Sequence, residues 1–310
     1  MRVLNICVDD YANFMHDNAK SLRSVGINCH DYKMVKHPFG YETESEIKSE
    51  YEISLIIKQF DLIQIFHSDD RFIGFCKGKR TVVYHTGTKY RQNPSGYNAV
   101  FNPNVEMCFV ALPEFVGLGA KNETYIVGAV DTDKLIQINK DNYVKTDKVK
   151  VAHYPSNPKV KGTAVINKVI EELLAEGLEF DYQHSTNLVT YPEQLKRIAK
   201  CDIYIELFAP MQGDKKYGSF GITGLEAMAM DKCVISMGNN GIYKNAYKND
   251  CAIFLVETKQ QLKEEIKAMV SYFKYNELGS SMSKVNCRLW AVKNHSYEAT
   301  GNFIKNKLGI

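Results

Sequence analysis

Short apolar runs alternate along the chain with longer segments in which apolar residues recur every three or four positions. In the first half, runs typical of buried strands lie at residues 3–8, 27–32, 62–66, 81–84, 105–111 and 125–127. Segments with helical spacing lie at residues 12–25 and 44–60. Strands separated by helices predict an α/β protein with a parallel, doubly wound sheet.

The same alternation restarts in the second half. Strands are expected at residues 149–152, 178–183, 203–207, around 234 and at 252–256, and helices at 163–176, 192–199 and 259–273. Two such halves predict two facing Rossmann-like domains. Residues 128–147 are polar and strongly charged, so we place the domain junction there. Residues 289–308 indicate one or two amphipathic helices, with Ser296 as an N-cap.

Composition narrows the class of protein only a little. The chain has 310 residues, is 45% hydrophobic and 24% charged, and carries a net charge of only +3. This charge permits a polyanionic acceptor without requiring one. No apolar run reaches the roughly 18 residues that a membrane-spanning helix needs. The eight cysteines are far apart and lack the spacing of a zinc or redox motif, so we expect a reducing cytoplasm.

Ligands of doubly wound sheets bind beyond the carboxyl ends of the strands, and this rule selects the loops that follow them. The loop at 85–91 could bind sugar hydroxyls or an acceptor's charge, although a histidine after a strand is often structural. Acidic pairs at 9–10 and 69–70 could bind a metal or act as a base, or could simply be solvated. The candidate acceptor or sugar residues are Asp9, Asp10, Tyr11, Thr86, Lys89, Arg91 and Asp214.

Two loops of the second half are suited to phosphate. In the first, Lys161 stands beside Gly162 at the start of a helix, where a lysine can act as a point charge on a phosphoryl oxygen. In the second, glycines at 218, 221 and 224 precede a helix that contains one acid, Glu226. Backbone N–H groups at a helix start suit an anion, and a carboxylate can accept hydrogen bonds from sugar hydroxyls. Together these loops indicate a nucleotide-diphosphate site.

Other nucleotide and hydrolase signatures are missing. The sequence has no P-loop motif, no Gly-x-Gly-x-x-Gly after the first strand, and no Gly-x-Ser-x-Gly elbow. A P-loop ATPase and a nicotinamide dehydrogenase are therefore not indicated.

Residues 220–235 (FGITGLEAMAMDKCVI) closely resemble the signature of family-four nucleotide-sugar glycosyltransferases, which have the two-Rossmann GT-B fold. Residues 155–163 are similar to the first loop of that family's donor domain, and 199–205 to the strand before its signature. Residues 128–133 resemble its interdomain turn, and 83–85 a strand that ends in histidine. The resemblance covers most of the second half and scattered points of the first.

The resemblance implies a retaining transferase that uses a nucleotide-diphosphate sugar, such as a UDP sugar, bound between the domains without a protein-bound metal. Its implied catalytic residues are His85 near the sugar, Lys161 on the diphosphate and Glu226 on the ribose. The implied donor-binding residues are Ser156, Asn157, Lys159, Gly162, Phe220, Gly221, Ile222 and Thr223. It also implies that C-terminal helices at 289–310 complete an N-terminal domain at 1–138, with the donor domain at 139–288.

The sequence departs from the family at two positions. Gly218 stands where a second glutamate is usual, and Glu206, Gln212 or Asp214 could substitute for it. Ser156 lies near the place of a missing arginine. The departures leave a second hypothesis open, a non-catalytic pair of domains that binds a nucleotide or a glycan. The acceptor is also open: a glycan, a small molecule or a modified DNA base, the last by analogy with small phage and viral sugar transferases.

Overall fold

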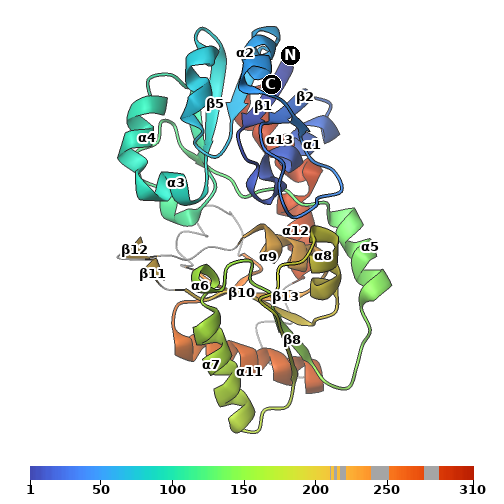
Figure 1. Cartoon of the computed structure of the whole chain (residues 1–310). Helices are drawn as coiled ribbons and strands as arrows, with labels where there is room; N and C mark the ends of the chain where they lie inside the picture. The colour runs from blue at the N-terminus through green and yellow to red at the C-terminus, as the bar shows by residue number, and fades with distance from the viewer. Residues whose placement is uncertain (210, 213–214, 217–220, 239–250, 276–285) are drawn as a thin grey trace. The chain divides into compact units, whose positions relative to one another are not determined.

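The computed structural model describes residues 1–209, 211–212, 215–216, 221–238, 251–275 and 286–310. It divides into two compact units (Figure 1). The first consists of Met1–Val130 with His295–Ile310, and the second of Asp131–Asn294. Each contains one large parallel sheet with helices, which confirms the predicted pair of Rossmann-like domains.

The sheet of the first unit has the strand order β3-β2-β1-β4-β5-β6-β7, and neighbouring strands run parallel. Its strands are β1 (Arg2–Cys7), β2 (Asn28–Lys33), β3 (Glu46–Ile47), β4 (Leu62–Ile65), β5 (Arg80–His85), β6 (Met107–Val110) and β7 (Thr124–Tyr125). The winding direction reverses between β1 and β4, which is where such sheets bind ligands. Four of the central strands, β1, β4, β5 and β6, are almost wholly buried.

The helices of the first unit are α1 (Phe14–Ser24), α2 (Glu50–Ile56), α3 (Gly87–Gln92), α4 (Pro94–Phe101) and α13 (Tyr297–Leu308). The last of these lies against α1, although the two come from opposite ends of the chain (Figure 1). A Cβ on Gly301 would stand 2.0 Å from the Ser21 carbonyl oxygen, so glycine lets the two helices approach closely. The Tyr297 hydroxyl also donates a 2.7 Å hydrogen bond to Asp17. Ser296 caps α13 through Ala299 N–H, as predicted.

The second unit has the strand order β14-β13-β10-β8-β9, again with parallel pairs. Its strands are β8 (Lys150–His153), β9 (Asp181–His184), β10 (Ile203–Leu207), β13 (Cys233–Met237) and β14 (Phe254–Val256). A separate pair is formed by β11 (Met211–Gln212) and β12 (Lys215–Lys216). The helices are α5 (Thr132–Asn142), α6 (Pro158–Lys161), α7 (Thr163–Ala175), α8 (Tyr191–Ala199), α9 (Ile222–Ala229), α11 (Lys259–Tyr275) and α12 (Cys287–His295).

The structure corrects the local predictions in three places. Residues 44–60 do not form one helix: β3 comes first, and α2 begins after Ser49, which forms a capping box with Glu52. The polar junction at 128–147 contains α5, whose N-cap Asp131 accepts a hydrogen bond from Lys134 N–H. Helix α3 forms where the sequence pattern predicts a loop, and helix α4 forms where it predicts no regular element.

The eight cysteines all lie within the described ranges and are free thiols. Among the described residues, no helix combines the length and the apolar character that a membrane crossing requires.

Candidate functional site

One carboxylate joins three segments of the second unit that are separate candidates in the sequence. Glu206, on β10, is 1% exposed and forms an ion pair with Lys161 at the end of α6. The same oxygen, Oε1, accepts a 3.2 Å hydrogen bond from the backbone N–H of Gly221, which precedes α9. Its second oxygen, Oε2, is buried without a hydrogen-bond partner in the part of the chain that the structure describes.

The turn at Gly162 holds Lys161 in place. Gly162 has φ +72°, a left-handed conformation that favours glycine. A Cβ at this position would lie 1.7 Å from the carbonyl oxygen of Phe208, just beyond β10. The Phe208 N–H in turn donates to the Lys161 carbonyl oxygen at 3.0 Å. The turn and the end of β10 are therefore packed backbone against backbone.

Glu226 lies on α9 and is 4% exposed. The hydroxyl of Tyr191, the first residue of α8, donates a 2.5 Å hydrogen bond to its Oε1. This bond orients the carboxylate. No pattern in the sequence marked Tyr191 as a site residue.

The other predicted donor residues that the structure describes belong to the segments around α6 and α9 and have less definite contacts. Asn157 caps α6 by accepting a hydrogen bond from Val160 N–H at 3.2 Å, while Ser156 and Lys159 are exposed. Ile222 and Thr223 are half-buried in the first turn of α9. Phe220, Gly218 and Asp214 lie outside the described residues.

His153, at the end of β8, is a structural histidine rather than an addition to the site. Its Nδ1 is 2.8 Å from the Ile205 carbonyl oxygen and its Nε2 is 2.9 Å from Thr163 Oγ1. Burial lowers the pKa of His153 to about 4, so the ring is neutral near pH 7. These two hydrogen bonds link the end of β8 to β10 and to the first residue of α7.

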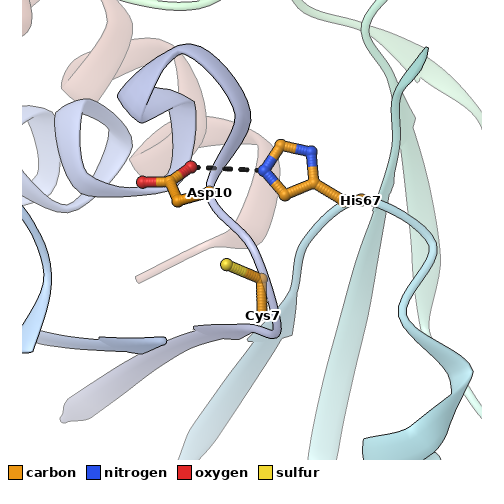
Figure 2. Close-up of side chains that lie close together, drawn as sticks. All are labelled: Cys7, Asp10 and His67. Carbon is orange, nitrogen blue, oxygen red and sulfur yellow. Dashed lines mark hydrogen bonds and ion pairs between the residues drawn. The ribbon is translucent and has the colours of Figure 1, made fainter. Parts of the chain in front are cut away.

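A second polar cluster lies where β1, β4 and β5 of the first unit end. Asp10 accepts hydrogen bonds from the backbone N–H groups of Met15 at 2.8 Å and His16 at 3.1 Å, which caps α1. His67 has its Nε2 3.2 Å from Asp10 Oδ1 and its Nδ1 2.6 Å from Thr86 Oγ1. Figure 2 shows the Asp10 and His67 side chains facing each other from neighbouring loops, with Cys7 below them.

The predicted catalytic His85 is fully buried. Its Nδ1 is 2.9 Å from Ser68 Oγ, and its ring stacks on Tyr90 with centroids 4.0 Å apart. Burial lowers the pKa of His85 to about 3, so the imidazole is uncharged near pH 7. Its role near a transferred sugar stays a prediction.

The remaining acceptor-side residues differ in exposure. Tyr11 is 52% exposed and packs edge-on against His67, with ring centroids 5.3 Å apart. Lys89 is exposed on α3. Arg91 forms a 2.8 Å ion pair with Glu114, and this pair restrains the Arg91 side chain within the first unit.

Asp69 is also part of this end of the sheet. It accepts a 2.8 Å hydrogen bond from Val8 N–H, and burial raises the pKa of its carboxyl. In the sequence, Asp69 stands out only as half of an acidic pair, and His67 only as the first residue of its loop. Both residues follow a buried strand, and this position is the only sequence signal that marks them as candidate site residues.

Comparison with known proteins supports the fold over the whole chain. A glycosyltransferase from Rickettsia africae ESF-5 matches with a TM-score of 0.64 and 15% identity, over 99% of this chain and 97% of that one. An α-glucosyltransferase in complex with UDP-glucose and DNA containing an abasic site matches with a TM-score of 0.66 and 10% identity, over 100% of both chains. The catalytic domain of starch synthase IV from Arabidopsis thaliana, bound to ADP and acarbose, matches with a TM-score of 0.64 and 10% identity, over 99% and 98%.

The two parallel sheets and these full-length matches define a GT-B-type fold of two Rossmann-like domains. No protein-family model and no curated protein matches the sequence. These structural neighbours are glycosyltransferases, and at 10–15% identity the likeness establishes the fold alone.

Proposed function

We propose that this protein is a retaining glycosyltransferase that moves a sugar from a nucleotide-diphosphate donor, a UDP sugar, to a hydroxyl acceptor. The observation that carries the proposal is the convergence of Lys161, Glu206 and Gly221 in one unit of a GT-B-type fold. Glu226 stands on the helix that begins at this convergence.

Lys161 supplies the charge that the leaving diphosphate requires. Its ammonium group has three donors, so it can keep Glu206 while it also binds a phosphoryl oxygen. Backbone N–H groups at the start of α9 add the positive end of a helix dipole. Donors fixed in advance around a developing negative charge are the largest common source of catalytic stabilisation.

Glu226 is proposed to accept hydrogen bonds from the ribose hydroxyls. Tyr191 already orients its carboxylate, so a bound ribose meets an acceptor that needs little reorganisation. A carboxylate has about four lone-pair sites and can accept hydrogen bonds from several partners at once.

Glu206 is proposed to recognise the sugar in place of the glutamate that position 218 lacks. Its buried Oε2 has no partner within the described residues, and leaving such an oxygen unpaired costs about 1–3 kcal/mol. A donor hydroxyl that bonds to this oxygen would remove that cost. The feature therefore favours a donor whose sugar reaches Glu206.

The acceptor is proposed to bind the first unit, near Asp9, Asp10, Tyr11 and Lys89. One structural neighbour was solved with DNA containing an abasic site, which supports including a modified DNA base among the acceptors to be tested. A glycan hydroxyl is the other acceptor class.

The test begins with a donor screen. The full chain is incubated with UDP, GDP and ADP sugars, and donor hydrolysis and transfer to glycans or hydroxymethylated DNA are measured by mass spectrometry. Thermal shifts with the free nucleotides report binding, since a ligand at 100 times its Kd adds about 2.7 kcal/mol. We expect UDP to raise the melting temperature and a UDP sugar to be consumed.

Single substitutions test whether donor turnover depends on Lys161 and Glu226. Lys161→Ala and Glu226→Gln should each abolish turnover, whereas Lys168→Ala, at an exposed lysine of α7, should leave it unchanged. No thermal shift with UDP, GDP or ADP and no consumption of any donor would refute the proposal. Nucleotide binding without turnover on every acceptor would instead favour the non-catalytic alternative.

A further inference from the structure

We propose that Cys7, Asp10 and His67 form a binding site for a borderline-soft divalent cation such as Zn²⁺. The three residues come from the end of β1, the loop after it and the loop after β4. They are 0%, 0% and 4% exposed, and their ligand atoms all lie within 4.8 Å of one another (Figure 2). The residues are too far apart in sequence to form a spacing motif, so only the fold brings them together.

The distance between two of the ligand atoms suits a metal of this kind. Zn²⁺ binds histidine nitrogen and carboxylate oxygen at roughly 2.0–2.2 Å in tetrahedral sites, which separates two such ligand atoms by about 3.3 Å. The observed distance from Asp10 Oδ1 to His67 Nε2 is 3.2 Å. A cation could therefore replace this hydrogen bond with little movement of either side chain.

The chemistry of the ligands also agrees. Thiolate, imidazole and carboxylate together favour zinc or a related transition metal over Mg²⁺ or Ca²⁺, which prefer oxygen ligands. On binding, the S–H bond of Cys7 breaks, its proton goes to solvent and the sulfur forms a bond to the metal. The fourth tetrahedral position would be left for a water or for an oxygen of a bound molecule.

A supporting shell is already built around two of the three ligands. The other ring nitrogen of His67 is 2.6 Å from Thr86 Oγ1, the kind of bond that fixes the orientation of a metal-binding histidine. The Asp10 carboxylate is held by the N–H groups of Met15 and His16.

Charge at this end of the sheet favours a cation as well, because three carboxylates (Asp9, Asp10 and Asp69) act on Cys7 against one ammonium, that of Lys33, which is already paired with Glu44. Asp69, two residues after His67, is buried, and Asp9 has a buried oxygen, Oδ1, without a partner among the described residues. An unpaired buried carboxylate oxygen next to the cluster is costly, and a nearby divalent cation would offset that cost.

The test is a cobalt titration of the full-length protein after treatment with a chelator. Co²⁺ bound by a thiolate gives a charge-transfer absorption in the near ultraviolet, and tetrahedral Co²⁺ absorbs in the visible. We expect both bands to saturate at one equivalent, to be displaced by Zn²⁺, and to be unaffected by Mg²⁺.

Variants identify the ligands. Cys7→Ser should abolish the charge-transfer band, whereas the matched control Cys108→Ser, at another buried cysteine of the same unit, should retain it. His67→Gln removes a ligand without altering the strand core, and should abolish saturable binding. Thr86→Val should weaken binding about 10- to 100-fold, as loss of an orienting partner does.

The outcomes are independent of sugar transfer, because no nucleotide sugar is present. Zn²⁺ should raise the melting temperature of the wild-type chain and of Cys108→Ser, but not that of His67→Gln. Absence of the thiolate band in the wild type, or its persistence in Cys7→Ser, would overturn the proposal.

Discussion

Replacing Gly162 with alanine should destabilise the second unit and weaken donor binding. Its φ of +72° costs an L-residue roughly 1–2 kcal/mol. The added Cβ would also lie 1.7 Å from the Phe208 carbonyl oxygen, which is backbone and cannot rotate away. Relieving such an overlap costs about 1–3 kcal/mol more, so the total loss in the free energy of unfolding should be roughly 2–5 kcal/mol.

Gly177 supplies the matched control, since it belongs to the same unit and has φ +84°, with nothing within 4 Å of the position that a Cβ would take. Gly177→Ala should therefore carry only the backbone cost of roughly 1–2 kcal/mol. Urea unfolding of both variants, followed by the same probe, measures the loss in the free energy of unfolding for each. The difference between the two losses is the cost of the overlap between the added Cβ and the Phe208 carbonyl oxygen. Equal losses for Gly162→Ala and Gly177→Ala would refute the packing argument.

Three further substitutions test other parts of the structure. Burial raises the pKa of Asp17 to about 7, so between pH 3.8 and about 7 the folded chain binds more protons than the unfolded chain. The contribution of Asp17 to stability should fall as pH rises through this window, by at most about 1.4 kcal/mol per pH unit, and the difference between urea melts of the wild type and of Asp17→Asn should show this fall. Gly301→Ala would place a Cβ 2.0 Å from the Ser21 carbonyl oxygen, and limited proteolysis should then release α13 faster than in the wild type. Glu44→Gln would leave the fully buried Lys33 ammonium without its partner, and should cost about 3 kcal/mol in urea melts; no loss would contradict this ion pair.

The sequence predicted the sheets well because their central strands are continuous apolar runs. It failed at α5, whose residues are mostly polar and which packs against α8 and α9 within its unit. The pattern of residues 132–142 contains too few apolar positions to separate a helix from a linker. It also failed at β3, which is only two residues long and pairs with the edge of β2.

The candidate site was predicted in parts but not as a whole. Lys161, Gly162 and Glu226 each carry a local signal, a cation beside a glycine or an acid on a helix after a glycine-rich loop. The link between Lys161 and Gly221 through Glu206 depends on strand neighbours that only the fold establishes. Burial of His85 beneath Tyr90 is likewise a matter of packing between elements, so its position after a strand could not reveal it.

The docking of α13 on α1 has a consequence for synthesis of the chain. The first unit is interrupted after Val130 and resumes only at His295, so the whole of the second unit emerges from the ribosome in between. The second unit can complete its sheet while the first still exposes the face of α1 that α13 will cover. The unit that begins first along the chain is therefore the last to be completed.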